Sequence, residues 1–215
     1  MSRYTIIIIA CLLLISCNGN ASESVKPFEP ASKDLKDELV SEVSHDVYST
    51  SSGRAEFYCD AIGTVGIFIG QSRSLNGHID LQDNTMEFSL RLKSLSTGID
   101  RRDNDMFVAL KADQHPEIRF KGSFQPAFNP YSTEKQAVTA TGEFHLHGVT
   151  NPMEVTGYLQ RQSDAIQMEA DWSMNVTDYD IDPPRVFFVR IAEELDVKVS
   201  ARLLPITSAE LSRNL

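Results

Sequence analysis

From about Arg54 to Leu203, apolar and polar residues alternate in eight runs, each as long as a β-strand. In the clearest run, Ile166 to Val176, every even-numbered position is apolar and every odd-numbered position is polar. A period of two places successive side chains on opposite faces of a strand, so that one face meets a core and the other meets water. The apolar positions of the other seven runs fall within 55–61, 75–81, 86–92, 118–124, 138–146, 153–159 and 195–203. The pattern predicts an all-β fold.

About eight antiparallel strands are enough to close a barrel, and the interior of such a barrel is filled by side chains or holds one small ligand. The large inward-facing side chains are therefore the candidate ligand-binding residues, with flexible methionines beside rigid aromatic rings. They are Phe57, Phe88, Phe120, Phe124, Phe144, Met168, Trp172 and Met174. A core packed solid by the same side chains is the alternative interpretation.

The connection after the third predicted strand, from Ser96 to Pro116, contains a helix signal. Asp103 is a residue type that caps helix starts, an apolar run follows it, and Pro116 ends the segment. We expect a short helix here that closes one end of the barrel through Met106, Phe107 and Leu110.

The N-terminus has the form of an export signal. One positive charge at Arg3 precedes an apolar run from Ile6 to Ile15, which is too short to span a bilayer. The run ends at Ser16-Cys17, which is similar to the lipobox of bacterial lipoproteins, whose cysteine is lipidated. We expect a signal peptide at 1–16, a lipidated N-terminus and tether at 17–46, a barrel domain at 47–205 and a tail at 206–215. The barrel would then be held at a membrane of the cell envelope, facing the periplasm or the exterior; a soluble secreted protein is the alternative.

Charge and cysteine content narrow the function classes. The formal net charge is -10, and no stretch rich in Lys and Arg interrupts the acidic surface, which excludes nucleic acid as the expected partner. With Cys11 in the signal peptide and Cys17 lipidated, Cys59 is the one thiol left in the domain. It shares the apolar face of the first strand with Phe57, so we interpret it as a core residue.

Two polar clusters are candidate metal sites. His145 and His147 lie two residues apart, hence on one face of a strand, but no further ligand follows at zinc spacing. Asp178, Asp180 and Asp182 resemble the start of a calcium loop, whereas Pro183 stands where that loop needs glycine. We expect surface histidines, a solvated acidic loop and no metal. No nucleophile–base arrangement indicates an enzyme.

Two stretches resemble the YceI-like family. One is Ser94-Leu95-Ser96-Thr97-Gly98-Ile99-Asp100-Arg101-Arg102-Asp103 with His115-Pro116-Glu117-Ile118-Arg119-Phe120-Lys121, in which His115 replaces the family's usual tyrosine. The other runs from Ala140 to Met153 and includes Gly148-Val149-Thr150-Asn151-Pro152. The resemblance implies an antiparallel, lipocalin-like eight-stranded barrel, which in some members holds a polyisoprenoid chain. It implies no catalytic residues.

Together these observations predict a non-catalytic, lipid-anchored protein whose barrel binds an isoprenoid, a quinone-like lipid or a similar long apolar molecule, and no other cofactor. Two alternatives remain: a structural or partner-binding barrel with a filled core, and an outer-membrane barrel, whose strands also alternate. Against the latter stand the expected anchor and the lack of aromatic girdles. Sequence identifies no protein partner.

Overall fold

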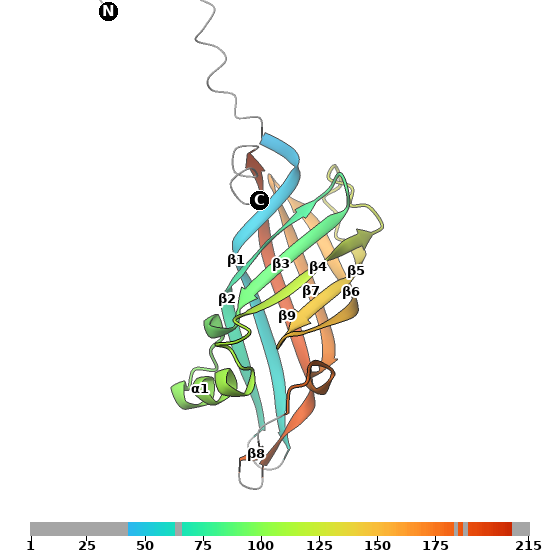
Figure 1. Ribbon diagram of the computed structural model, residues 1–215. Coiled ribbons are helices and arrows are strands. Elements are labelled where there is room, and N and C mark those ends of the chain that lie inside the picture. Colours follow the sequence, from blue (N-terminus) through green and yellow to red (C-terminus); the bar gives the residue numbers. More distant parts are fainter. Residues whose placement is uncertain (1–42, 63–65, 183–184, 187–188, 208–215) are drawn as a thin grey trace, which may run out of the picture. The chain divides into compact units, whose positions relative to one another are not determined.

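The computed structural model describes residues 43–62, 66–182, 185–186 and 189–207. Within them, eight long strands form one antiparallel sheet in the order β1-β2-β3-β4-β5-β6-β7-β9, and pairing of β1 with β9 closes it into a barrel (Figure 1). The predicted eight-stranded, lipocalin-like all-β fold is confirmed. The long strands are β1 (Val43–Ile62), β2 (Gly66–Asp80), β3 (Thr85–Arg91), β4 (Glu117–Gln125), β5 (Gln136–Leu146), β6 (Val149–Gln162), β7 (Ala165–Asn175) and β9 (Val189–Thr207).

The shorter elements lie between strands. A 3-10 turn, η1 (Leu92–Ser94), and the helix α1 (Asp100–Ala109) connect β3 to β4. A second 3-10 turn, η2 (Val176–Tyr179), and the two-residue strand β8 (Arg185–Val186) connect β7 to β9. The predicted helix after the third strand is therefore present. No helix in the described part of the chain is long and apolar enough to cross a membrane.

The start of α1 differs from the sequence prediction. The helix begins at Asp100, its N-cap position is Ile99, and no side chain caps it. Asp103, predicted as the cap, lies inside the first turn, and its carboxylate instead accepts hydrogen bonds from Ser96 and Thr97. An aspartate followed by an apolar run fits both positions, because either places the carboxylate near free N–H groups.

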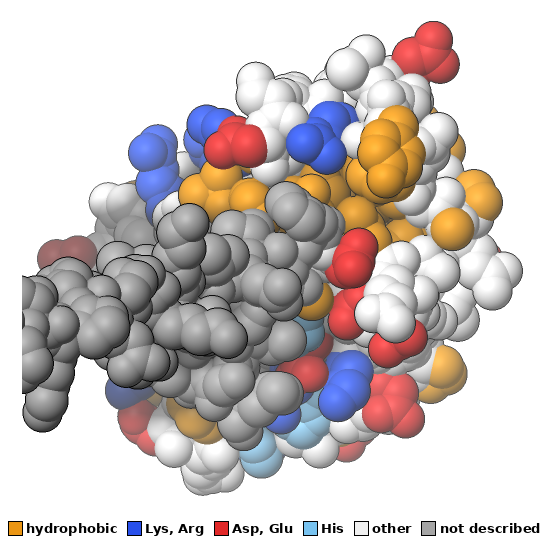
Figure 2. Space-filling view, turned by 90° about the horizontal axis from the view of Figure 1, so that it is seen from above, with side chains coloured by type: hydrophobic (Ala, Val, Ile, Leu, Met, Phe, Trp, Pro, Cys, Tyr) orange, Lys and Arg blue, Asp and Glu red, His pale blue; other side chains and the backbone are white. Residues whose placement is uncertain are grey.

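One end of the barrel, the packed end, is filled by side chains. It carries the turns that join β2 to β3 and β6 to β7, and the loop that joins β4 to β5. Five large side chains at this end have at most 1% of their surface exposed: Ile79, Phe124, Leu159, Ile166 and Leu203. The end is dry and close-packed, as protein interiors generally are. Figure 2, seen from this end, shows acidic and basic side chains interspersed rather than separated by sign.

The opposite end, the open end, carries α1, η2 and β8. β1, β2 and β9 are 20, 15 and 19 residues long, and in Figure 1 they extend past the shorter strands of this end. β3 pairs only with residues 76–80 of β2, and further along β2 the loop before α1 takes its place through a bridge between Gln71 and Ser96. The wall of the barrel is therefore uneven here.

Along β7, the burial of the inward-facing side chains decreases from the packed end to the open end. Ile166 is completely buried and Met168 nearly so, whereas the next inward residues, Ala170, Trp172 and Met174, are half-buried. All five share one face, as the period of two predicted. The half that lies toward the open end therefore faces space and not a packed core.

The barrel forms a compact unit that begins at Ser41. Its sheet closes on itself, and the buried hydrophobic residues described lie between Val47 and Ile206, so this unit contains the elements that it needs to fold alone. The predicted signal peptide, Cys17 and the tether up to residue 42 lie outside the described residues, as do residues 208–215 of the predicted tail. The described strands begin at Val43 and end at Thr207, against a predicted domain of 47–205.

Candidate functional site

The interior of the barrel toward the open end holds a cavity of about 940 Å³. Carbon-rich side chains from β1 to β7 and β9 form most of its wall, and α1 and the η2 segment border it. The polar residues that line it are Glu56, Ser89, Thr97, Arg101, Arg102, Asp105 and Asp182. A cavity of this size and composition is typical of a site for an apolar small molecule.

Seven of the eight predicted ligand-binding residues line this cavity: Phe57, Phe88, Phe120, Phe144, Met168, Trp172 and Met174. Phe124 does not line it. It lies on the same face of β4 as Phe120, but four residues closer to the packed end, where its side chain is 1% exposed. Alternation identifies the face of a strand, whereas the depth along the barrel depends on where the neighbouring strands end.

The predicted lid residues divide in the same way. Met106 and Leu110 line the cavity, and Phe107 instead packs against the hydrophobic core without reaching the lining. The face of α1 that borders the cavity also includes Arg101, Asp105 and Val108, at the spacing of successive helical turns. The helix therefore presents a mixed polar and apolar face to the entrance.

All five methionines other than Met1 line the cavity: Met86, Met106, Met153, Met168 and Met174. Methionine is unbranched and polarizable, so it adapts to irregular apolar shapes. Concentration of every internal methionine on one surface favours a wall that adjusts to its occupant over one that is packed for stability alone.

Aromatic rings stiffen the wall between these methionines. Phe144 makes edge-to-face contacts with Trp172, at 6.4 Å between ring centroids, and with Tyr179 of η2, at 5.6 Å. Phe57 lies so close to Gly70 on the neighbouring strand that a Cβ built on that glycine would fall 2.0 Å from its ring. The absence of a side chain at Gly70 lets the ring lie flat against the wall and leaves the interior open.

Asp103 fixes the loop that leads into α1. Its carboxylate accepts hydrogen bonds from the Ser96 hydroxyl at 2.7 Å, the Thr97 hydroxyl at 2.5 Å and the Thr97 backbone N–H at 2.7 Å. Burial raises the pKa of this carboxyl, but the hydrogen bonds from Thr97 and Ser96 and the charge of Arg102 outweigh burial and hold the pKa below its ordinary value. The residue is a structural anchor of the helix that borders the entrance.

Arg102 joins the helix to the barrel wall at β2. Its guanidinium lies 5.0 Å from the centre of the Phe68 ring on β2, a cation–π contact at the edge of the cavity. Arg101, one residue earlier, is exposed and has no hydrogen bond or ion pair with any residue that the structure describes. One arginine therefore fixes the helix in place, and the other points a free charge at the entrance.

The histidine prediction is wrong in its geometry. β5 ends at Leu146, and His147 follows with a φ of 55°, which turns its side chain inward, where it is 5% exposed. Its Nδ1 lies 2.8 Å from the carbonyl oxygen of Tyr179, to which it must donate, while His145 bonds to the Thr150 hydroxyl. The two imidazoles share no face because the strand stops between them.

His147 and Asn151 hold the η2 segment against the barrel. The side-chain amide of Asn151 donates to the backbone oxygen of Asp178, and burial raises the pKa of the Tyr179 phenol. Asp178, Asp180 and Asp182 lie in and after this segment. Among the described residues, no three His, Cys, Asp or Glu side chains are grouped to hold a metal ion.

Cys59 is buried, lines the cavity and has no disulfide partner. Burial and the charge of neighbouring Asp60 raise the pKa of its thiol to about 11, so it is protonated at neutral pH. It therefore contributes to the apolar wall as a small uncharged side chain.

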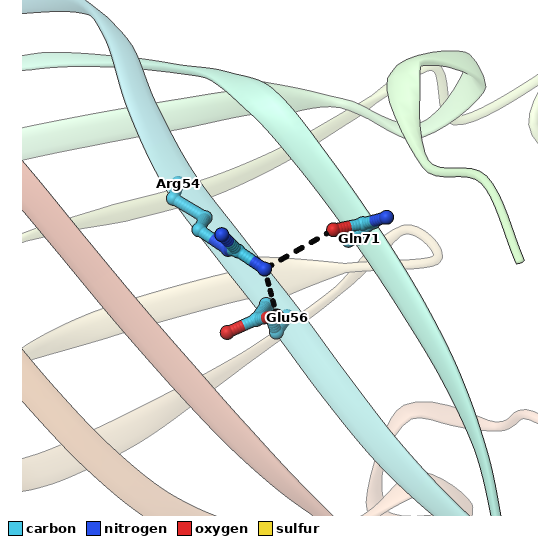
Figure 3. A network of polar contacts seen from close by, with 3 residues as sticks. All are labelled: Arg54, Glu56 and Gln71. Carbon is cyan, nitrogen blue, oxygen red and sulfur yellow. Dashed lines mark hydrogen bonds and ion pairs between the residues drawn. The ribbon is translucent and has the colours of Figure 1, made fainter.

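The outer face of the same wall is polar. Figure 3 shows the Arg54 guanidinium pointing at Glu56, 2.6 Å away on β1, and at the Gln71 amide oxygen on β2, at 3.2 Å. The side chains of Arg54 and Glu56 are 43% and 19% exposed, so water partly screens this network and its contribution to stability is small.

Several lining residues were not in the predicted site, including Phe68, Met153, Leu195 and Val197. Met153 and Leu195 do lie in the apolar sets of predicted strands. The alternation therefore predicted that their side chains face the interior, but not how far along the barrel they lie. Phe68 lies in Gly66-Ile67-Phe68-Ile69-Gly70, a short apolar run between glycines without alternation, and this signal was available in the sequence.

A closed antiparallel barrel of eight strands, packed at one end and hollow at the other, defines the structural class of this protein. The chain belongs to the YceI-like domain family, whose sequence model matches residues 41–203. This confirms the resemblance seen in the Ser94–Lys121 and Ala140–Met153 stretches.

Solved structures show the same fold at low sequence identity. A polyisoprenoid binding domain from Saccharophagus degradans, implicated in plant cell wall breakdown, is 16% identical with a TM-score of 0.64 over 74% of this chain and 98% of its own. BcnA from Burkholderia cenocepacia is 11% identical with a TM-score of 0.55 over 69% and 95%. A mutant YceI protein of Campylobacter jejuni is 13% identical with a TM-score of 0.50 over 66% and 85%. No curated protein sequence matches this chain.

Proposed function

We propose that this protein binds an isoprenoid, a quinone-like lipid or a similar long apolar molecule inside its barrel, and that it carries or buffers this molecule without changing it. The cavity of about 940 Å³ with its almost wholly apolar wall is the observation that carries the proposal. Membership of a family with a polyisoprenoid-binding structural relative supports the ligand class.

The alternative of a filled, purely structural barrel has less support. A solid core would bury the inward side chains along the whole of β7, whereas burial decreases at Ala170, Trp172 and Met174. An apolar cavity in water has no favourable interaction to make with solvent, so such a space is retained most readily where a ligand fills it.

The proposed role is not catalytic. Cys59, the one thiol at the wall among the described residues, is held protonated by a pKa of about 11. Asp103, the buried carboxylate beside the cavity, already accepts three hydrogen bonds and stays ionised, so it is poorly suited to abstract a proton.

We further propose that the protein is a lipoprotein of the cell envelope, anchored through acylated Cys17. The short apolar run before Ser16-Cys17 supports this proposal. A membrane anchor would keep a carrier of apolar molecules close to the bilayer in which such molecules dissolve.

Two measurements test the ligand proposal. Native mass spectrometry of the purified barrel should find an added mass that organic solvent extracts as an apolar molecule. After delipidation, a polyprenyl alcohol should change the fluorescence of Trp172, the single tryptophan, in a saturable way, because its ring lies in the cavity wall. Absence of both an extractable ligand and a saturable signal would leave the filled-core or partner-binding interpretation.

A further inference from the structure

We propose that the open end of the barrel docks on the surface of a phospholipid bilayer through exposed aliphatic side chains, and that ligand passes between bilayer and cavity at this contact. The surface, called the rim below, consists of Ile67, Ile69, Ile99 and Val108. The inference rests on the proposed function, since it concerns how an apolar ligand reaches the cavity.

The first observation is where exposed aliphatic side chains gather. Among the described residues, five large aliphatic side chains are exposed, and four of them belong to the rim. Ile67 and Ile69 lie at the beginning of β2. Ile99 immediately precedes α1, and Val108 lies in the last turn of this helix. These parts of β2 and α1 belong to the open end. The fifth, Leu204, is near the end of β9, toward the packed end.

The second observation is that the rim lies beside the entrance of the cavity. Val108 is 78% exposed and yet lines the cavity, so its side chain lies at the entrance itself. Ile67, which is 66% exposed, and Ile69 lie on the outer face of β2, on either side of Phe68, whose ring lines the cavity and contacts Arg102 of α1. Scattered exposed apolar residues are common on proteins, but a group at the mouth of an apolar cavity is the signature of an interaction site.

The third observation is the charge beside the rim. The chain as a whole has a net charge of -10, which repels anionic surfaces. On α1, Arg101 and Arg102 stand against Asp100, Asp103 and Asp105, a formal charge of -1, so charge attraction does not drive this contact. Arg101, which lacks an ion-pair partner among the described residues, can contact a lipid phosphate while the aliphatic side chains insert beside it.

These features favour a bilayer over a protein as the occupant. The ligand class that the cavity fits dissolves in membranes and barely in water, so transfer needs a continuous apolar path between bilayer and cavity. Because insertion and not charge drives the contact, the barrel should bind vesicles of zwitterionic phosphatidylcholine without any anionic lipid.

The test uses the barrel unit from Ser41 to Leu215, which lacks Cys17 and therefore any anchor. Flotation with phosphatidylcholine vesicles should recover the parent protein in the vesicle fraction. The double change Ile67→Ser and Ile69→Ser, at two rim residues that do not line the cavity, should weaken vesicle binding by at least about tenfold, since two aliphatic side chains no longer enter lipid. Leu204→Ser, a matched control at an exposed site near the packed end, should change binding by less than about twofold.

A transfer measurement separates this inference from the proposed function. Trp172 fluorescence follows uptake of a polyprenyl alcohol from vesicles or from detergent micelles. The double variant should take it up more slowly from vesicles but at the parent rate from micelles, and equal melting temperatures would show that all three proteins are folded.

The possible failures are distinct. A parent that fills from micelles but does not float with vesicles overturns bilayer docking and points to a protein at the rim, with the proposed function intact. Equal losses in the double variant and in Leu204→Ser overturn the assignment of the rim. A parent that floats in a rim-dependent way but takes up no polyprenyl alcohol from either source overturns the proposed function and leaves docking standing.

Discussion

Asp103 does not cap α1. Its carboxylate stabilises the molecule by accepting three hydrogen bonds from the loop that precedes this helix. Replacing it by asparagine removes the charge and leaves one acceptor oxygen for the Ser96 hydroxyl and the two Thr97 donors. We expect Asp103→Asn to lower the free energy of unfolding at pH 7 by about 1–3 kcal/mol, as for other buried hydrogen bonds to charged groups. Asp105→Asn, an exposed change on the same helix, should cost much less, and chemical denaturation measures both.

The same residue predicts a pH dependence. Its folded-state pKa is lowered, so its contribution to stability is complete above the unfolded value of about 3.9 and is lost as the pH falls below it toward the folded pKa. The difference in stability between the parent and Asp103→Asn should therefore shrink when the pH is lowered from 7 to 3. A difference that stays constant over this range would contradict the role of the ionised carboxylate.

Cys59 reports on the cavity wall. Its pKa of about 11, against an ordinary value of 9.0, lowers the thiolate fraction at pH 8 about a hundredfold. In the unit from Ser41 onward, where Cys59 is the single cysteine, iodoacetamide should alkylate the folded protein at least that much more slowly than the denatured chain. The rate should rise as the pH approaches 11, and bound ligand should slow it further. Rapid alkylation at pH 7 would contradict this environment.

At the scale of the elements, two glycines let β4 and β5 approach closely on the inner face. Gly122 and Gly142 are paired in register, and a Cβ at Gly122 would lie 2.3 Å from the backbone oxygen of Thr141. Because the obstacle is backbone, the strands themselves would have to move apart. We expect Gly122→Ala to lower stability by about 1–3 kcal/mol, whereas Ser123→Ala, at the next and exposed position of the same strand, should be nearly neutral. Thermal unfolding of the two variants measures the contrast.

The elements also show how far the sequence could be interpreted. Each of the eight strands was predicted because one side of every strand faces an apolar interior, which imposes a period of two on the chain itself. The N-cap of α1 was misplaced by four residues, at Asp103 and not at Ile99, because Asp103 satisfies donors of the preceding loop, and that pairing exists only once the loop has folded over the helix. His147 was placed on the wrong face because the strand ends one residue before it.

At the scale of the whole molecule, the barrel should tolerate added volume at one end and not at the other. Ala170 lines the cavity, so Ala170→Phe should be absorbed with little loss of stability, while polyprenyl alcohol binding followed by Trp172 fluorescence should be lost. Ala165, on the same strand, is completely buried at the packed end. Ala165→Phe should therefore cost about 1–3 kcal/mol or more by overpacking. Equal destabilisation by both changes would indicate a solid barrel.

The proposed anchor gives a prediction for the complete protein in its cell. Cys17→Ala removes the acceptor of the acyl chains, so the variant should move from the membrane fraction to the soluble envelope fraction. The rim should retain a small part of it at the membrane, and adding Ile67→Ser and Ile69→Ser should release that part. Retention of Cys17→Ala at the level of the natural sequence would show that Cys17 is not the anchor.

The sequence by itself determined the strands, the closed all-β class and the identity of most side chains that face the interior. These features follow from local periodicity, because each strand must separate an apolar side from a wet one wherever it lies. Phe57, Phe88, Phe144 and Trp172 were found in this way.

Only the tertiary structure decided which part of that interior is hollow. Phe124 and Phe120 are four residues apart on one face, yet the first is enclosed at the packed end and the second borders the cavity. The difference arises because β1, β2 and β9 extend beyond their neighbours while α1 and η2 border the space beside them. Contacts between segments far apart in the chain set the ends of the strands, their register and the placement of the loops. A local sequence pattern therefore cannot predict these features.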